Sequence, residues 1–134
     1  MDMERINPAE LARPSGFSHA VSVPAGRLVF LAGQTGMDRD GRIVPGGVVA
    51  QFEQALSSLL TALAAAGGQP SDLASVTIYL TDVEDYQAHG KEIGQVWRRL
   101  AGSDYPAMAG VGVTRLWHPD AVVEIQGFAV VSRS

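Results

Sequence analysis

The 134-residue sequence contains no cysteine. This absence excludes disulfide bonds, thiolate nucleophiles and cysteine-ligated zinc sites. It is also the composition expected in a reducing compartment, so we predict a cytoplasmic location.

Long runs of one residue type are missing as well. The 10 basic and 14 acidic residues are interspersed and give a net charge of −4. No basic run could neutralise several phosphates in succession, so we expect no nucleic-acid partner. No stretch approaches the roughly 18 uninterrupted apolar residues of a membrane span, and the start at Met1 does not resemble a secretory signal, so we expect no membrane partner.

The length and the hydrophobic fraction of 46% fit one globular domain covering residues 1–134. From Val49 to Leu63 apolar residues recur at helical spacing, and Gly67-Gly68 stands where a left-handed cap is expected. The segment Leu73–Leu80 is rich in β-branched and aromatic residues and predicts a strand. A second helix is predicted from a cap at Thr81 or Asp82 as far as Leu100.

The remaining segments predict strands. Residues 18–23 and 28–31 read as a β-hairpin turned by Pro24-Ala25-Gly26, and two further strands are expected at 107–113 and 122–131. This order predicts an α+β fold in which a mixed β-sheet has two helices on one face. The last strand has apolar residues at both odd and even positions, so the sheet face without helices is apolar as well. We expect subunits to associate through that face and cover it.

Few residues are candidates for chemistry. His19, His89 and His118 are far apart without partners at ligand spacing, and neither phosphate-binding glycine pattern is present, so no metal or cofactor is expected. Glu124 lies inside an apolar run and, if buried, must be hydrogen-bonded, paired or protonated, which makes it the best catalytic candidate. Alternatively it faces away from the core and is only solvated. Gly33 follows an apolar strand and could present its N–H to a ligand, or belong to an ordinary turn.

Several segments together resemble the Rid family (reactive intermediate deaminase, YjgF-like, also labelled endoribonuclease L-PSP). The resemblance covers nearly the whole chain and rests on Asn7-Pro8, Pro14-Ser15-Gly16-Phe17-Ser18-His19-Ala20, Phe30-Leu31-Ala32-Gly33-Gln34, Gly41-Arg42-Ile43-Val44, Gln54-Ala55-Leu56, Ala64-Ala65-Ala66-Gly67, Leu73-Ala74-Ser75-Val76, Tyr79-Leu80-Thr81-Asp82, Tyr105-Pro106-Ala107, Arg115-Leu116 and Val123-Glu124-Ile125. It implies a chorismate-mutase-like fold and a homotrimer with three clefts between subunits, each binding a small molecule.

The resemblance also shows where this sequence departs from the family. In deaminating members an arginine after Pro-Ala binds the substrate carboxylate, and a glutamate on the last strand helps to position water; here Met108 follows Pro106-Ala107. A thioether has neither the charge nor the N–H fork of arginine. Gly90 replaces an asparagine and Gly110 a small polar residue or cysteine. By position, the resemblance implies a cleft lined by Phe17, Gly33, Gly90, Met108, Gly110 and Glu124.

Two functions follow as hypotheses. The first is an enzyme that hydrolyses (deaminates) or rearranges a reactive imine or enamine other than a simple 2-iminoacid, with Glu124 as general acid or base and the Gly33 N–H steadying the substrate. The alternative is a non-catalytic trimer that binds a metabolite or has a regulatory role in the same cleft. RNA cleavage ranks last, because the acidic chain lacks a basic stripe and paired histidines.

Overall fold

The structure of the protein is a computed structural model that describes residues 3–132. It contains six strands, three α-helices and a short 3-10 helix. In chain order these are β1 (Glu4–Ile6), β2 (Ala20–Ser22), β3 (Arg27–Thr35), α1 (Gly47–Ala65), η1 (Pro70–Asp72), β4 (Leu73–Leu80), α2 (Val83–Ala88), α3 (Gly90–Ala101), β5 (Ala107–Gly112) and β6 (Val123–Val131).

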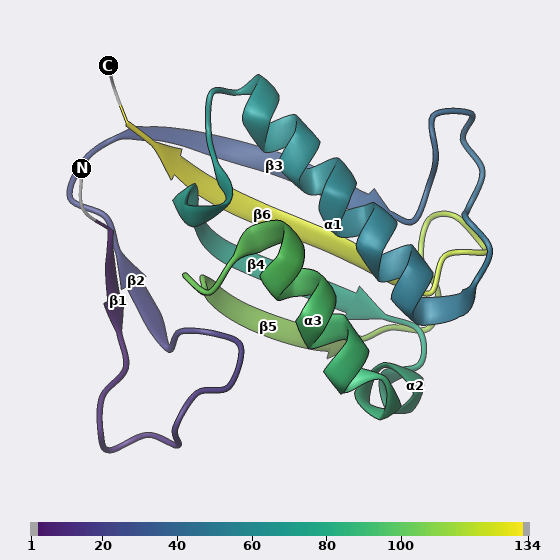
Figure 1. Ribbon diagram of the computed structural model, residues 1–134, viewed down its shortest axis with the longest axis horizontal. Helices are drawn as coiled ribbons and strands as arrows, with labels where there is room; N and C mark the ends of the chain where they lie inside the picture. Colours follow the sequence, from purple (N-terminus) through teal and green to yellow (C-terminus); the bar gives the residue numbers. More distant parts are fainter. Residues whose placement is uncertain (1–2, 133–134) are drawn as a thin grey trace.

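Four strands form the main sheet in the order β3-β6-β4-β5. The last strand, β6, is central and pairs antiparallel with β3 and β4, whereas β4 and β5 are parallel. Helices α1 and α3 lie side by side on one face of this sheet (Figure 1). The predicted α+β fold, a mixed sheet with its two long helices on one face, is therefore confirmed.

The core lies between the sheet and these helices. The apolar stripe of α1 supplies fully buried side chains such as Phe52, Leu56 and Leu59. Helix α1 ends at Ala65 and is followed by Gly67, which has a φ of 88°; the N–H of Gly68 bonds to the carbonyl of Leu63 at 3.0 Å. This is the predicted left-handed glycine cap. By length and composition α1 could cross a membrane, but its buried stripe on the sheet is that of a core helix in a soluble α+β domain.

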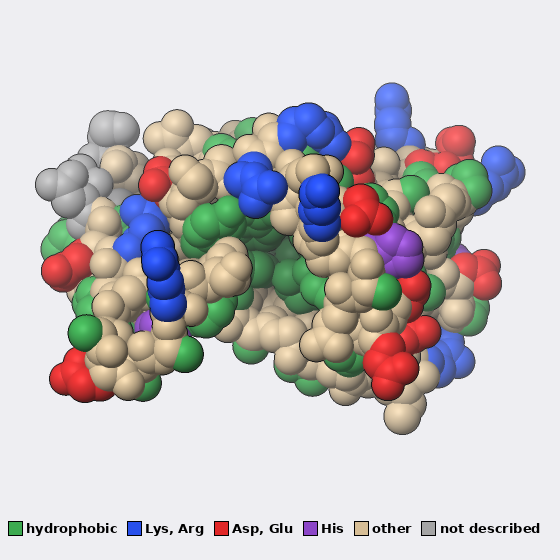
Figure 2. Space-filling view, turned by 60° about the horizontal axis from the view of Figure 1, so that its bottom comes forward, with side chains coloured by type: hydrophobic (Ala, Val, Ile, Leu, Met, Phe, Trp, Pro, Cys, Tyr) green, Lys and Arg blue, Asp and Glu red, His purple; other side chains and the backbone are tan. Residues whose placement is uncertain are grey.

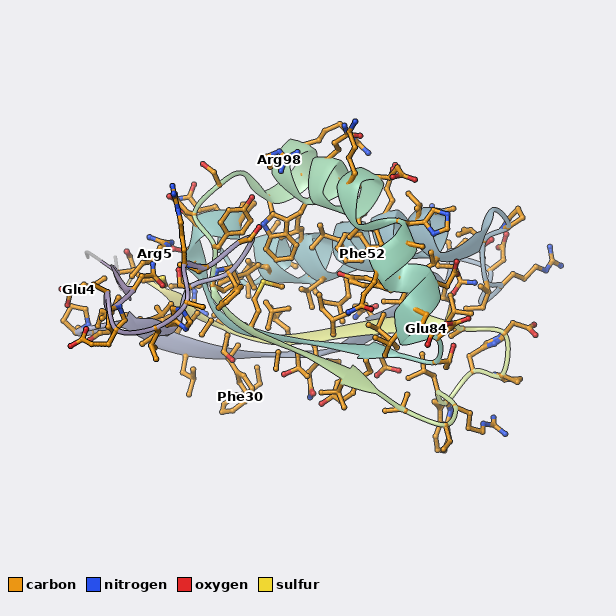
Figure 3. The ribbon with its side chains drawn as sticks, turned by 90° about the horizontal axis from the view of Figure 1, so that it is seen from below. Glu4, Arg5, Phe30, Phe52, Glu84 and Arg98 are labelled. Atoms are coloured by element: carbon orange, nitrogen blue, oxygen red, sulfur yellow. The ribbon has the colours of Figure 1, made fainter. Side chains whose placement is uncertain are left out.

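Strict alternation along the central strands gives the sheet two different faces. In β6, Val123 and Ile125 are fully buried beneath the helices, and the even-numbered residues face the other way. Figure 3 shows Phe52 on the helix side of the sheet and Phe30 on the opposite side. No helix among the described residues covers that opposite face, where Phe30 is 72% exposed and packs edge-on against Phe128. We refer to it as the open face.

Two expectations from the sequence were wrong. Strand β2 pairs with β1, near the N-terminus, and not with β3, so residues 18–31 do not form a hairpin. The turn at Pro24–Gly26 instead carries the chain from the small sheet into the large one. The predicted second helix is divided at His89 into two helices, α2 and α3. Helix α2 ends before His89, and Gly90 begins α3. Asp82 caps α2 as predicted, accepting from the Asp85 N–H at 3.0 Å.

Candidate functional site

A cleft of about 470 Å³ opens on the helix side of the sheet, between α3 and β5. In Figure 2 it is a hollow with hydrophobic side chains inside and Lys or Arg side chains along its upper border. The lining residues come from the N-terminal loop, all three helices, β4 and β5: Ser15, Gly16, Phe52, Ile78, Tyr86, Gly90, Lys91, Ile93, Gly94, Trp97, Arg98, Tyr105 and Met108.

The structure brings two of the expected site residues, Met108 and Gly90, together in this cleft. Met108 pairs with Val76, whose side chain is in the core, so Met108 also faces the helices. Gly110 is two residues further along β5, so it faces the same side as Met108, and it pairs with the core residue Ile78. No atom lies within 4 Å of a Cβ built on Gly90 or Gly110, so both glycines leave space open.

Aromatic residues form much of the cleft wall. Trp97 stacks on Tyr105 with 6.3 Å between ring centroids, and it is only 5% exposed. The indole Nε1–H of Trp97 is buried and has no hydrogen-bond acceptor among the described residues. Trp97 is therefore both a core residue and part of the cleft.

Tyr86 adds a hydroxyl to the same wall, edge-on to Phe52 with centroids 6.0 Å apart. Burial raises the pKa of Tyr86 to about 12. At neutral pH the phenol is therefore a hydrogen-bond donor and not a base.

The cleft border carries positive charge. Lys91 and Arg98 line it from α3, and no Asp, Glu or His of the described chain does so. His89, just before α3, bonds through Nδ1 to the Asp85 carbonyl at 2.8 Å. That hydrogen bond is the main cause raising the pKa of His89; desolvation opposes it, and the charges of Asp85 and Glu92 add to it.

Glu124 lies on the other side of the sheet. Its strand partners are Thr35 on β3 and Tyr79 on β4, which also face away from the helices. Within residues 3–132 the Glu124 carboxylate has no hydrogen-bond partner and no ion-pair partner. The half-buried Glu124 therefore lies on the open face and not in the cleft with Met108. This is the alternative orientation predicted from the sequence, in which Glu124 faces away from the core.

A β-bulge brings Gly33 beside Glu124. The pairing of β3 with β6 shifts between Leu31 and Gln34, so that Ala32 and Gly33 stand opposite Gln126 alone. A Cβ built on Gly33 would collide with Glu124 Oε2. Gly33 and Glu124 therefore lie side by side on the open face, and the missing side chain of Gly33 leaves room for the carboxylate in this position. We refer to this pair as the open-face half-site.

Phe17 is close to the cleft but does not line it; its ring packs edge-on against His19 at 5.1 Å. The adjacent Ser18, which sequence reasoning missed, anchors this loop. The Ser18 N–H bonds to the Pro106 carbonyl at 2.9 Å and its Oγ to the Tyr105 carbonyl at 2.7 Å. These bonds hold Ser15 and Gly16 at the cleft mouth.

Gln51 is a second buried polar residue whose role no pattern in the sequence indicated. Its Oε1 accepts from the Val122 N–H at 2.9 Å, and its Nε2 donates to the Asp120 carbonyl at 3.3 Å. Gln51 thus ties α1 to the residues that lead into β6. It fixes the start of the strand that carries Glu124.

No group of three or more possible metal ligands occurs in the described part of the chain. The cleft offers hydrophobic contacts, a phenol donor and two cations, whereas the open face offers a carboxylate beside an exposed backbone. Such an arrangement can bind an apolar molecule and transfer a proton, provided that the two half-sites meet.

The chain is similar to several known proteins over most of its length. A family model described as "Endoribonuclease L-PSP" matches residues 8–131. The chain is 36% identical over 115 residues to the 2-iminobutanoate/2-iminopropanoate deaminase of Capra hircus, covering 85% of this chain and 79% of that protein. It is 32% identical to the RutC family protein UK114 of Drosophila melanogaster, over 93% of this chain and 87% of that one.

A solved structure is similar over almost the full length. It is that of a Rid family protein of unknown function, YyfB, from Yersinia pestis, with a TM-score of 0.86 and 32% identity. The match covers 98% of this chain and 100% of that one.

Proposed function

Since the chain belongs to the endoribonuclease L-PSP family, also known as the Rid or YjgF-like family, we propose that it is a small-molecule enzyme of the deaminase type. Its substrate is a reactive imine or enamine that is not a simple 2-iminoacid. Relatives named as 2-iminobutanoate/2-iminopropanoate deaminases support the reaction type.

The exclusion of simple 2-iminoacids as substrates rests on Met108. It occupies the position where the deaminating relatives are expected to have arginine, and it lines the cleft among apolar side chains. Losing one side of a buried charge pair costs about 2–5 kcal/mol, or roughly thirtyfold to several thousandfold in affinity. A 2-iminoacid carboxylate therefore has no partner at this depth.

In the proposed mechanism Glu124 acts on the water. Its carboxylate takes a proton from water as the water oxygen bonds to the carbon of the protonated imine, which gives a neutral carbinolamine. The proton on Glu124 then moves to the amine nitrogen and the C–N bond breaks, so that ammonia leaves. The carbonyl product forms as the carbinolamine hydroxyl gives its proton to the Glu124 carboxylate, from which the proton passes to solvent. The backbone N–H of Gly33 steadies the polar group of the substrate.

This mechanism needs a second copy of the chain, because Glu124 and the cleft are on opposite faces of one sheet. We propose a homotrimer in which the open face of one subunit meets the cleft of the next, the substrate lying between them. The exposed apolar side chains of the open face, notably Leu28, Phe30 and Phe128, support this assembly.

A second candidate is a non-catalytic trimer that binds a metabolite in the same cleft or has a regulatory role. It is favoured by the cleft lining, which contains no Asp, Glu or His side chain among the described residues.

The test measures ammonia release from a neutral imine, generated from 2-phenylethylamine by a flavin amine oxidase, with this protein and with its Glu124→Gln variant. We expect acceleration by the wild type and a loss of about 10²–10⁴-fold in the variant. Full turnover by Glu124→Gln would overturn the assignment of Glu124. No acceleration by the wild type on a panel of neutral and carboxylate-bearing aryl imines would favour the non-catalytic binding protein.

A further inference from the structure

We infer that the cleft selects an amphipathic anion, whose planar apolar body lies inside and whose carboxylate is held at the mouth by Arg98 and Lys91. The positive charge that the relatives are expected to place on the sheet is in this chain supplied by helix α3. The inference rests on the proposed function, because it names the substrate class of that site.

The two cations are placed on the cleft by helix geometry. Lys91 and Arg98 are seven residues apart on α3, which puts them on the same side two turns apart. The Arg98 guanidinium bends back along the helix: its Nη1 lies 3.6 Å from the position of a Cβ on Gly94. The guanidinium therefore lies beside Gly94 at the cleft wall.

Both charges are free to bind a ligand. Among residues 3–132 neither Lys91 nor Arg98 has an ion-pair partner within 4.0 Å, and no carboxylate lines the cleft. The neighbouring Arg99, by contrast, is paired with Glu53 at 2.7 Å and does not line the cleft. The cleft mouth is therefore complementary to an anion.

The interior defines the rest of the ligand. Phe52, Trp97 and Tyr105 present aromatic surface, and Met108 adds a polarisable thioether that packs well against rings. The unpartnered Trp97 Nε1–H adds a donor within this wall. A flat aryl group fits such a lining better than a short alkyl chain does.

The position of the charge separates this substrate class from a 2-iminoacid. Met108 is on the sheet, whereas Lys91 and Arg98 are on the helix layer above it. A carboxylate held by α3 is therefore separated from the reacting C=N group by the apolar body of the molecule. The inferred class is an aryl-substituted carboxylate with its imine remote from the carboxylate.

Calorimetric titration with 3-phenylpropanoate, its neutral amide and propanoate tests this inference. We expect the acid to bind about three- to tenfold more tightly than the amide, and propanoate to bind more weakly than either. Arg98→Gln should remove most of this preference and Lys91→Gln/Arg98→Gln nearly all of it. Arg99→Gln is the matched control, since it removes the same charge from the same helix outside the cleft, and it should keep the preference.

Equal binding of acid and amide, no binding of either, or an unchanged preference in the double variant would overturn the inference. The outcome is separable from that of the proposed function. Glu124→Gln should bind 3-phenylpropanoate as the wild type does while losing turnover. Turnover of imines by the wild type together with equal binding of the acid and the amide would uphold the enzyme and reject its anionic substrate.

Discussion

Met108 and Glu124 lie on opposite faces of the same sheet. Met108 pairs with Val76 and faces the helices, whereas Glu124 pairs with Tyr79 and faces the open side. Since strand alternation fixes these directions, no side-chain rotation within one chain can bring the two together. One chain thus has two half-sites.

Mixing of subunits tests whether the half-sites meet across an interface. Glu124→Gln disables the open-face half-site, and Gly90→Trp fills the cleft at an exposed position where no atom lies within 4 Å of the added Cβ. Each variant alone should be inactive. Unfolded and refolded together in equal amounts, they should recover roughly a quarter of wild-type turnover, because each site takes its halves from two subunits at random.

Analytical ultracentrifugation of the same samples gives the control, because the mixture must have the same mass as the wild-type assembly. No recovery of turnover in mixed assemblies of the correct mass would contradict a site shared between two subunits.

Met108→Arg should create activity toward 2-iminoacids. The guanidinium restores the missing carboxylate partner, and we expect a gain of about thirtyfold or more in ammonia release from enzymatically generated 2-iminopropanoate. Without substrate the added charge lies among Phe52, Ile78 and Trp97, so the melting temperature should fall. Met108→Leu is the control without a charge. If the wild type already deaminates 2-iminopropanoate, another residue holds the carboxylate.

Local sequence signals predicted the elements well, but not their pairing. The β-branched segment Leu73–Leu80 and the Gly67 cap are as expected, because alternation and backbone conformation are local properties. Strand β2 pairs with β1 and not with β3, and β5 lies parallel to β4; partner choice depends on contacts distant in sequence. For the same reason the sequence did not separate Met108 from Glu124, although alternation foresaw that Glu124 faces away from the core.

Ser18 and Gln51 were missed for a related reason. Their side chains bond to backbone atoms 87 and about 70 residues away, and no spacing in the sequence reveals such partners. The Gly33 half-site was proposed from its position after an apolar strand. The bulge that presses it against Glu124 could not be foreseen, because a bulge is defined by the opposite strand.

Gly33→Ala should lower turnover without unfolding the protein. The new methyl group would collide with Glu124 Oε2 and displace the carboxylate, and a shift of about 1 Å at a reacting group costs on the order of 10²-fold. Because the effect is exerted through Glu124, Gly33→Ala should add nothing in a Glu124→Gln background. Additive losses in the double variant would show that Gly33 acts independently.

Gln51→Ala should destabilise the fold by about 1–3 kcal/mol, since it leaves the part-buried N–H of Val122 without its acceptor. Urea unfolding at neutral pH measures the difference. The matched variant is Gln54→Ala on the same helix, where the lost bond is to Ser58 Oγ and each group regains water. Similar midpoints for the two variants would contradict the role of Gln51 in holding the start of β6.

Tyr86 predicts how the free energy of unfolding depends on alkaline pH. Its pKa is about 12 in the folded chain against an ordinary value of 10.0, because burial disfavours the phenolate. Below pH 10 the folded and the unfolded chain both keep the Tyr86 proton, so the contribution of Tyr86 to the free energy of unfolding is fully present. Between pH 10 and 12 only the unfolded chain loses the proton, so the free energy of unfolding falls, by at most about 3 kcal/mol.

In Tyr86→Phe this part of the decline should be absent, and parallel pH profiles for wild type and variant would show that Tyr86 is accessible to water. Absorbance titration of the three tyrosines gives a direct reading, because the variant should lack the component that ionises near pH 12.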